Sequence, residues 1–212
     1  MTKNLLIFLI SLLPFNKLRI FFFNFLPNYK IDYKSYIGFL VLIDCNKCTI
    51  NNSKICFLTS ISVNEVNIEN SVIKKKNIFR DFHELIIKEN NIINQNNKFY
   101  GNFPISEYSK FEIGKSCVIG FENFFDLSGS INIENNCIIL DYCQIWTHGF
   151  KSTREITKGN VIIGENVKIE SAVTVISKVQ VIKNCIIKVG SIVTKSINKE
   201  GIYSSNELFR KN

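Results

Sequence analysis

The two histidines are the side chains of this sequence best suited to proton transfer, and they stand in different settings. His148 follows Trp146 and Thr147 and precedes a polar, charged stretch at residues 151–158, which we expect to project as a loop beside it. Because a neutral imidazole titrates near the working pH, it can take a proton from a hydroxyl or an amine. We therefore predict that His148 is a catalytic base, with a structural turn histidine as the alternative. His83 lies where the apolar pattern is weakest, which favours an exposed or structural role.

The seven cysteines do not form a metal site by their spacing. Cys45 and Cys48 are the one C-x-x-C pair, and no second pair or nearby histidine completes a zinc site. We therefore expect no bound metal. Four of the cysteines instead recur at a position of the sequence repeat described below where small apolar side chains are expected. We interpret them as buried, reduced thiols, as in a cytosolic protein. That position is occupied by Cys117, Cys137, Cys143 and Cys185.

The net charge of +8 and the pI near 9.1 favour an anionic partner, which is a nucleic acid, a phosphate-bearing cofactor, a sugar nucleotide or a membrane surface. The lysines are scattered, and residues 74–76 are the only run of three. No ladder of aromatic and basic residues is visible, so we expect no nucleic-acid binding. A chain of 212 residues is long enough for one domain with its own core.

The amino-terminal segment is strongly apolar over residues 5–13 and again over 20–26. Neither run reaches the roughly 20 apolar residues that a membrane span needs, and Pro14 and two basic residues interrupt the pair. No small-residue cleavage site follows the first run. The segment therefore predicts a short helical hairpin. It either caps the end of the domain or lies in a membrane interface with Lys17 and Arg19 at the headgroups.

A six-residue period governs the carboxyl-terminal half of the chain. Two aliphatic series, four residues apart in phase, follow it: Ile163, Ile169, Val175, Val181, Ile187 and Val193, and Val167, Val173, Val179, Cys185 and Ser191. The same period continues upstream with a two-residue slip, and less regularly before residue 100: Ile113, Ile119 and Phe125; Ile133, Ile139 and Ile145; Ile37 and Ile43; Ile50, Cys56, Ser62 and Ile68; Ile87, Ile93 and Phe99. Residues 74–86 read as an irregular insertion.

This period predicts short strands joined by tight turns, with three sides closing a coil of about eighteen residues. The backbone groups of each coil pair with the coils above and below, so only the two ends need caps. We expect residues 1–30 to form an apolar helical cap, 31–200 the β-helix with a loop at 149–160, and 201–212 a tail.

Two stretches of sequence resemble the hexapeptide-repeat, or isoleucine-patch, acyltransferases: residues 159–169, which read GNVIIGENVKI, and residues 189–195, which read VGSIVTK. The similarity covers residues 110–205 well and 35–100 loosely. It implies a left-handed parallel β-helix, a homotrimer with active sites between subunits, and a CoA thioester as cosubstrate.

Within this family the sequence is most similar to sugar acetyltransferases of cell-surface polysaccharide synthesis. The reduced thiols indicate a cytoplasmic protein, which lies at the inner face of the cell membrane if the amino-terminal segment binds lipid. The resemblance implies acetyl transfer from acetyl-CoA to a hydroxyl or amine of a sugar in polysaccharide or lipopolysaccharide biosynthesis.

The resemblance also assigns residues on the acceptor side of the site. The family carries its catalytic histidine in a similar Thr-His-Gly setting, which matches His148. A His-x-x-Asp pattern one coil earlier reads Asn123 to Asp126 here, so the aspartate is kept and the histidine is not. With eighteen residues per coil and the slip of two, Asp126 should stack near Trp146 and orient His148 or accept a sugar hydroxyl. The alternative is a solvated turn aspartate. Asn123 and Trp146 are the predicted substrate contacts.

On the cofactor side the resemblance points to backbone N–H groups and to basic residues. Where the family has a glycine- and alanine-rich run holding the thioester carbonyl, this chain has Glu170, followed by Ser171 and Ala172, whose backbone donors are predicted to serve. Lys195 is predicted to meet the cofactor's phosphates, with Arg210 or Lys211 as further candidates.

Other functions fit the residues less well. A nucleotide-sugar pyrophosphorylase is excluded by the length and the missing glycine-rich loop. A γ-type carbonic anhydrase needs three histidine ligands, and the chain has two histidines. A serine acetyltransferase stays as an enzyme alternative. The alternative from another class is a non-catalytic scaffold or membrane-surface module, which Asn123 and Glu170 favour and His148 opposes.

Overall fold

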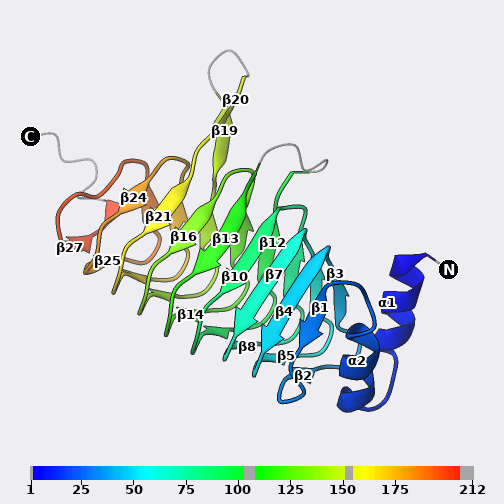
Figure 1. The fold of residues 1–212 in the computed structure, drawn as a ribbon. Helices are drawn as coiled ribbons and strands as arrows, with labels where there is room; N and C mark the ends of the chain where they lie inside the picture. The colour runs from blue at the N-terminus through cyan, green and yellow to red at the C-terminus, as the bar shows by residue number, and fades with distance from the viewer. Residues whose placement is uncertain (1, 103–107, 151–154, 206–212) are drawn as a thin grey trace, which may run out of the picture.

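The computed structural model describes residues 2–102, 108–150 and 155–205. In this part of the chain, three parallel sheets form the sides of an elongated prism, with two helices at one end (Figure 1). Each coil contributes one strand to each sheet, and neighbouring coils pair in parallel. The predicted mainly β, parallel β-helix with a short amino-terminal helical segment is therefore confirmed.

In each of the three sheets the strands stack along the prism in chain order. Sheet A contains β1 Tyr29–Ile31, β4 Lys47–Asn51, β7 Glu65–Glu69, β10 Glu84–Ile87, β13 Lys110–Ile113, β16 Ile131–Ile133, β21 Val161–Ile163 and β24 Gln180–Val181. Sheet B contains β2 Tyr36–Ile37, β5 Lys54–Ile55, β8 Val72–Ile73, β11 Ile92–Ile93, β14 Val118–Ile119, β17 Ile138–Ile139, β22 Lys168–Ile169, β25 Cys185–Ile187 and β27 Gly201–Tyr203. Sheet C contains β3 Leu42–Asp44, β6 Ser60–Ser62, β9 Ile78–Arg80, β12 Lys98–Tyr100, β15 Phe124–Asp126, β18 Gln144–Ile145, β23 Thr174–Val175 and β26 Ile192–Val193.

The interior of the prism is a stack of aliphatic and phenylalanine side chains. Every member of the two series that begin at Ile163 and Val167 is buried, and so are the four cysteines at the small position. Two of the inward positions predicted for the early coils are wrong by one residue. Ile55 and Ile61 point inward and are fully buried, whereas Cys56 and Ser62 are half-buried. Residues 74–86 are no insertion either, because they form β9 and the start of β10 with Phe79 in the core.

The length of the coil varies mainly at one edge, where sheet C leads into sheet A of the next coil; we call it the C–A corner. From sheet B to sheet C the inward residues are six apart in each coil, as in Ile119 to Phe125. At the C–A corner the step is eight residues from Phe125 to Ile133 and eighteen from Ile145 to Ile163. Extra residues therefore leave the prism along this one edge.

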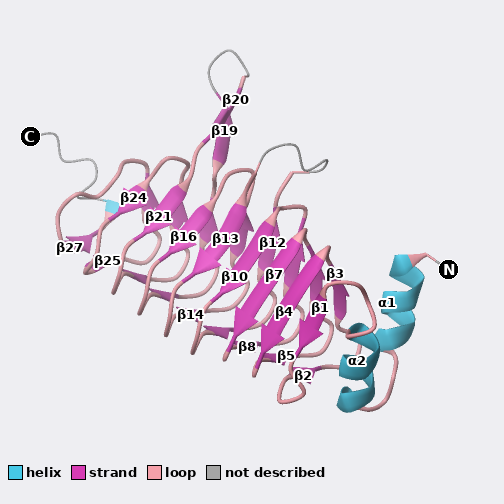
Figure 2. Cartoon of the chain, in the orientation of Figure 1, coloured by secondary structure: helices cyan, strands magenta, loops and turns pink. Residues whose placement is uncertain are grey.

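The longest described excursion at the C–A corner is a β-hairpin. β19 His148–Phe150 pairs antiparallel with β20 Ile156–Lys158, and the hairpin projects away from the prism (Figure 2). Its register places His148 opposite Lys158, at the base of the hairpin. The prediction of a loop at 149–160 beside His148 needs a correction, since the described residues form two strands and His148 itself begins the first.

The helices α1 Lys3–Ser11 and α2 Asn16–Phe23 cover the first coil at the amino-terminal end. Asn16 accepts the Ile37 N–H at 2.8 Å, and Asn24 accepts the Ile31 N–H at 2.8 Å. The buried Arg19 donates to the Ile37 carbonyl at 2.9 Å. These bonds satisfy backbone groups that no earlier coil can pair. The two helices thus pack on the first coil and give its unpaired edge hydrogen-bond partners. No helix in the described ranges is long and apolar enough to cross a membrane.

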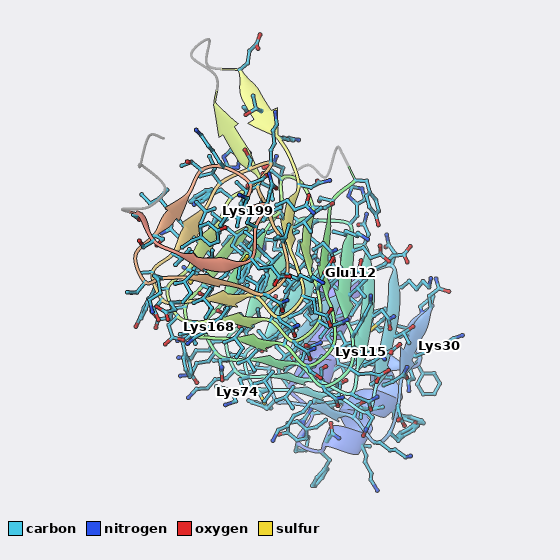
Figure 3. All side chains as sticks on the ribbon, turned by 90° about the vertical axis from the view of Figure 1, so that its left-hand side faces the viewer. Lys30, Lys74, Glu112, Lys115, Lys168 and Lys199 are labelled. Atoms are coloured by element: carbon cyan, nitrogen blue, oxygen red, sulfur yellow. The ribbon has the colours of Figure 1, made fainter. Side chains whose placement is uncertain are left out.

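At the other end, the predicted tail begins as part of the sheet. β27 pairs in parallel with β25, so residues 201–203 extend sheet B. Arg210 and Lys211 lie outside the described residues. Figure 3 looks toward this end and shows side chains, among them Lys74 and Lys168, projecting outward around the prism.

A ladder of polar side chains lines the turn between sheets B and C; we call this edge the B–C corner. Asn77 accepts the Asn97 N–H at 2.9 Å, and Asn97 accepts the Asn123 N–H at 2.9 Å. Asn123 in turn accepts the Cys143 N–H at 2.7 Å. In the turn the coils cannot form the backbone hydrogen bonds that join the strands. Each asparagine oxygen accepts the backbone N–H of the next coil instead, so these buried N–H groups keep a partner.

Replacing Asn97 with alanine is expected to lower the free energy of unfolding by about 1–3 kcal/mol. The side-chain amide also donates to the carbonyls of Asn94 and Gly120, both at 2.9 Å, and the substitution leaves these groups without their partners. Urea unfolding measures the change. Gln95→Ala, in the same turn, is the control, and equal midpoints for both variants would contradict the ladder's role.

Candidate active site

His148 and Asp126 form a close pair at the C–A corner. His148 Nδ1 lies 2.8 Å from Asp126 Oδ2. The Asp126 side chain is 6% exposed and that of His148 is 27% exposed, so the carboxylate lies behind an imidazole that reaches the surface. The pairing of β15 with β18 aligns Phe125 with Ile145, which puts Asp126 beside Trp146 as predicted. The sequence therefore predicted this juxtaposition correctly.

The carboxylate of Asp126 is held by several donors besides the imidazole. Oδ2 accepts the backbone N–H groups of Thr147 at 2.8 Å and His148 at 2.9 Å. Oδ1 accepts the Ser128 hydroxyl at 2.7 Å and the Ser128 N–H at 3.2 Å. Burial raises the pKa of Asp126, but hydrogen bonds from Ser128, His148 and Thr147 outweigh it and hold the pKa below its usual value. Asp126 is therefore an anion at neutral pH, and it is not a solvated turn residue.

An ionised Asp126 fixes the tautomer of the neutral imidazole. A carboxylate only accepts hydrogen bonds, so Nδ1 carries the proton and donates it to Oδ2. The lone pair of the neutral ring then lies on Nε2. The arrangement can accept a proton at Nε2 and stabilise the resulting imidazolium through the adjacent carboxylate.

Two residues that the sequence-based prediction missed build the corner around this pair. Thr147 is fully buried; its hydroxyl donates to the Asp126 carbonyl at 2.8 Å and accepts the Gly129 N–H at 2.7 Å. Ser128, with its two bonds to Asp126, lies within the two-residue slip between Phe125 and Ile133. That slip was visible in the sequence, and it is the signal that could have identified Ser128.

A row of aromatic rings leads from His148 across the outside of sheet C. The rings of Trp146 and His148 are 5.8 Å apart, those of Phe124 and Trp146 5.0 Å, and those of Tyr100 and Phe124 6.1 Å. Phe124 also borders a groove of about 390 Å³, whose other lining residues are Lys76, Asn96, Lys98, Glu122 and Asn123. The predicted substrate contact Trp146 is therefore brought to the His148–Asp126 pair.

Asn123, the other predicted substrate contact, lies at the opposite corner of sheet C. It is 1% exposed, and its side chain bonds to Asn97 and Cys143 as the last amide of the B–C ladder. It borders the groove at Phe124 but bonds to neither member of the pair. Asn123 therefore supports the turn at the B–C corner.

The predicted cofactor contacts are divided between the two corners of sheet C. Ser171 and Ala172 lie at the B–C corner, where the Ala172 N–H donates to the Asp141 carbonyl at 2.9 Å. The expectation that this N–H is available for a thioester needs correction, because it is already bonded within the turn. Glu170 forms an ion pair with Lys188 at 2.8 Å and accepts the Val189 N–H at 3.1 Å. Glu170 is therefore held in the wall of the prism.

Lys195, by contrast, lies on the same edge as His148. The aligned residues Ile145, Val175 and Val193 are each followed two positions later by Thr147, Ser177 and Lys195. Lys195 is exposed, two coils beyond Thr147, which corresponds to about 10 Å at the usual strand spacing. Lys178, also exposed, lies between them. Its side chain passes close to Gly159, where a β-carbon would collide with it. An anionic group beside His148 would find these two amines on the next coils.

His83 lies at the same C–A corner, between β9 and β10, three coils before His148. Its Nδ1 accepts the Ser109 N–H at 3.2 Å, and its ring lies 5.4 Å from that of Tyr108. Both interactions are within the coil wall, which agrees with the structural role predicted for it.

The fold is similar to two solved structures at low sequence identity. One is the polySia specific acetyltransferase NeuO, at 19% identity over 80% of this chain and 79% of that chain, with a TM-score of 0.40. The other is the polysialic acid O-acetyltransferase OatWY, at 17% identity over 78% of this chain and 81% of that chain, with a TM-score of 0.44. No protein-family model and no curated protein matches the chain. The chain is thus similar in its β-helix fold to these two acetyltransferases.

Proposed function

We propose that this protein is an acyltransferase that moves an acetyl group from a CoA thioester to a hydroxyl or amine of a sugar in cell-surface polysaccharide or lipopolysaccharide synthesis. The observation that carries the proposal is the His148–Asp126 pair, with its 2.8 Å bond at a surface-exposed corner. A base of this kind suits an acceptor that must lose a proton as it attacks. The resemblance of residues 159–169 and 189–195 to hexapeptide-repeat acyltransferases supports the same reaction class.

In the proposed reaction His148 Nε2 accepts the proton of the acceptor group while its oxygen or nitrogen bonds to the thioester carbonyl carbon. The carbon–sulfur bond breaks, and the proton held on the imidazole passes to the departing thiolate, so that a free thiol leaves. Asp126 keeps Nδ1 protonated throughout and stabilises the imidazolium that forms between the two transfers.

Acetyl-CoA is the proposed cosubstrate, and it supplies the activated acyl group. The exposed Lys195 and Lys178 lie on the His148 edge and fit the phosphates of such a molecule by charge. Ser171 stays a proposed contact at the B–C corner, through its backbone N–H. A homotrimer with its sites between subunits is part of the proposal, as is a location in the cytoplasm at the inner face of the membrane.

Trp146→Ala is expected to raise the KM for the sugar acceptor by roughly 3–10-fold with a smaller effect on kcat. The indole lies edge-on to the His148 ring and presents an apolar face beside the proposed reacting atoms. Initial rates at varied acceptor concentration measure the changes in KM and in kcat separately. Trp146→Phe should recover most of the loss, and Phe57→Ala, on an early coil, should behave like the wild type. A fall in kcat alone would contradict an acceptor-binding role.

The test of the proposed function is release of free thiol from acetyl-CoA in the presence of a panel of nucleotide sugars and polysaccharide fragments. Acceptor-dependent release that disappears in His148→Ala is the expected result. Mass spectrometry of the product then identifies the acylated sugar. No release with any acceptor, together with no CoA binding by calorimetry, would overturn the proposal in favour of a non-catalytic β-helix scaffold. Release with serine but with no sugar would favour a serine acetyltransferase.

A further inference from the structure

The two amino-terminal helices are apolar on two opposite sides, although an end cap needs only one apolar side. Their inner side buries Ile7 and Ile10 of α1 and Ile20 and Phe23 of α2 against the first coil. A second set of large apolar side chains points away from the prism and is at least 40% exposed. This set, which we call the outer apolar face, consists of Leu5, Phe8, Leu9, Leu12, Phe15, Leu18, Phe21, Phe22 and Phe25.

The spacing of the outer apolar face shows that it is a continuous feature of each helix. In α1 it begins at Leu5 and repeats three, four and seven residues later, and the same spacing begins at Leu18 in and just after α2. These intervals place side chains on one side of a helix. Phe21 and Phe25 have their rings 4.7 Å apart, and Phe15 and Phe25 are 67% and 70% exposed. An apolar surface of this extent on the outside of a protein marks an interaction site.

The charged residues of the helical segment itself are of one sign. Residues 1–31 contain three lysines and one arginine and no aspartate or glutamate. Arg19 is buried in the cap and Lys3 pairs with Asp44 at 2.7 Å, which leaves two exposed amines, Lys17 on α2 and Lys30 on the adjoining strand β1. A second copy of the chain would bring the same positive charges face to face, which opposes self-association.

We propose that the outer apolar face docks onto the surface of an anionic lipid bilayer, with α1 and α2 lying in the interface plane. Short helices with large apolar side chains and neighbouring lysines bind in this way, because the apolar side enters the acyl boundary and the amines meet the headgroups. The prism then extends from the bilayer with the His148–Asp126 pair on its fifth and sixth coils. At the usual strand spacing β18 lies about 24 Å from β3 of the first coil.

Co-sedimentation of the full chain with extruded vesicles tests this docking without any substrate, so its outcome is separate from that of the acyl-transfer assay. We expect the wild type to sediment with vesicles of phosphatidylcholine and phosphatidylglycerol at 3:1, and less with phosphatidylcholine alone. Phe15→Ser/Phe25→Ser should lower the partition coefficient at least tenfold, and Lys17→Glu/Lys30→Glu should remove the preference for the anionic lipid.

The matched control is Val189→Ser/Ile202→Ser, which removes two equally exposed apolar side chains, 64% and 62%, from the opposite end of the prism. It should sediment like the wild type, and circular dichroism checks that each variant is folded. Wild-type protein that stays in the supernatant with anionic vesicles would overturn the proposal, as would equal sedimentation of Phe15→Ser/Phe25→Ser. Light scattering that shows a dimer which this variant dissociates, without lipid binding, would identify a second copy as the occupant and also overturn it.

Discussion

Replacing His148 with alanine is expected to lower kcat for acetyl transfer by about 10²–10⁴-fold, the range that a positioned general base contributes. The methyl side chain cannot accept the acceptor's proton, while the carboxylate of Asp126 keeps its bonds from Thr147 and Ser128. The coil should therefore stay folded. Initial rates of thiol release measure the loss, and thermal unfolding followed by circular dichroism checks the fold.

His83→Ala is the matched control for this variant, because it removes the other imidazole of the chain. His83 accepts one backbone N–H and lies three coils before His148, so its loss should leave kcat within about a factor of two of the wild type, as expected for a substitution away from the reacting atoms. Full activity in folded His148→Ala would withdraw the base role. Equal losses in both variants would point to a shared effect on folding.

Asp126→Asn is expected to lower kcat on the order of 10²-fold and the free energy of unfolding by about 1–3 kcal/mol. The amide removes the charge that stabilises the imidazolium, and its NH₂ group would face the donors that now bond the carboxylate. Asp141→Asn is the control, since Asp141 accepts the Phe121 N–H at 2.8 Å in another turn. Unchanged activity in Asp126→Asn would reduce Asp126 to a structural residue.

The pH dependence of stability gives an independent readout of Asp126. Its pKa is lowered in the folded state, chiefly because the hydrogen bonds to the anion outweigh burial. A lowered pKa means that the ionised group stabilises the fold above its unfolded value of about 3.9, and that this stabilisation is lost as the pH falls through the folded value. The wild type should therefore lose stability more steeply below about pH 4 than Asp126→Asn does. Parallel curves would contradict the assignment.

The interior of the prism was predictable from the sequence wherever the turns kept one length. From Ile163 onward each side takes six residues, and the predicted inward positions are the buried ones. The early coils shorten the step after sheet A to five residues, as between Ile50 and Ile55. The residue types alone do not reveal a turn that is shorter by one residue. Cys56 and Ser62 are small enough for an inward position and are equally compatible with a position outside the core.

The parts of the candidate site whose position follows from the length of a coil were predictable from the sequence. The parts that depend on the conformation of the turns were not. Asp126 and Trp146 are twenty positions apart, one coil plus the slip, and this placed the carboxylate beside His148. Ser128 and Thr147 act through their hydroxyls in a corner, and hydroxyl residues are equally common in turns without function. The engagement of the Ala172 N–H likewise depends on the backbone of the preceding coil, at Asp141, which local sequence does not specify.

Because the added length is confined to the C–A corner, the segments that surround the candidate site can vary separately from the strands that form the fold. Insertions and deletions at that edge leave the coils on either side in register, because the strands before and after them still pair coil by coil. The segments between Tyr100 and Lys110 and between His148 and Val161 can thus differ in length without disturbing the strands on either side. In the proposed reaction, exchange of these segments would change the acceptor preference and leave the β-helix that carries them unchanged.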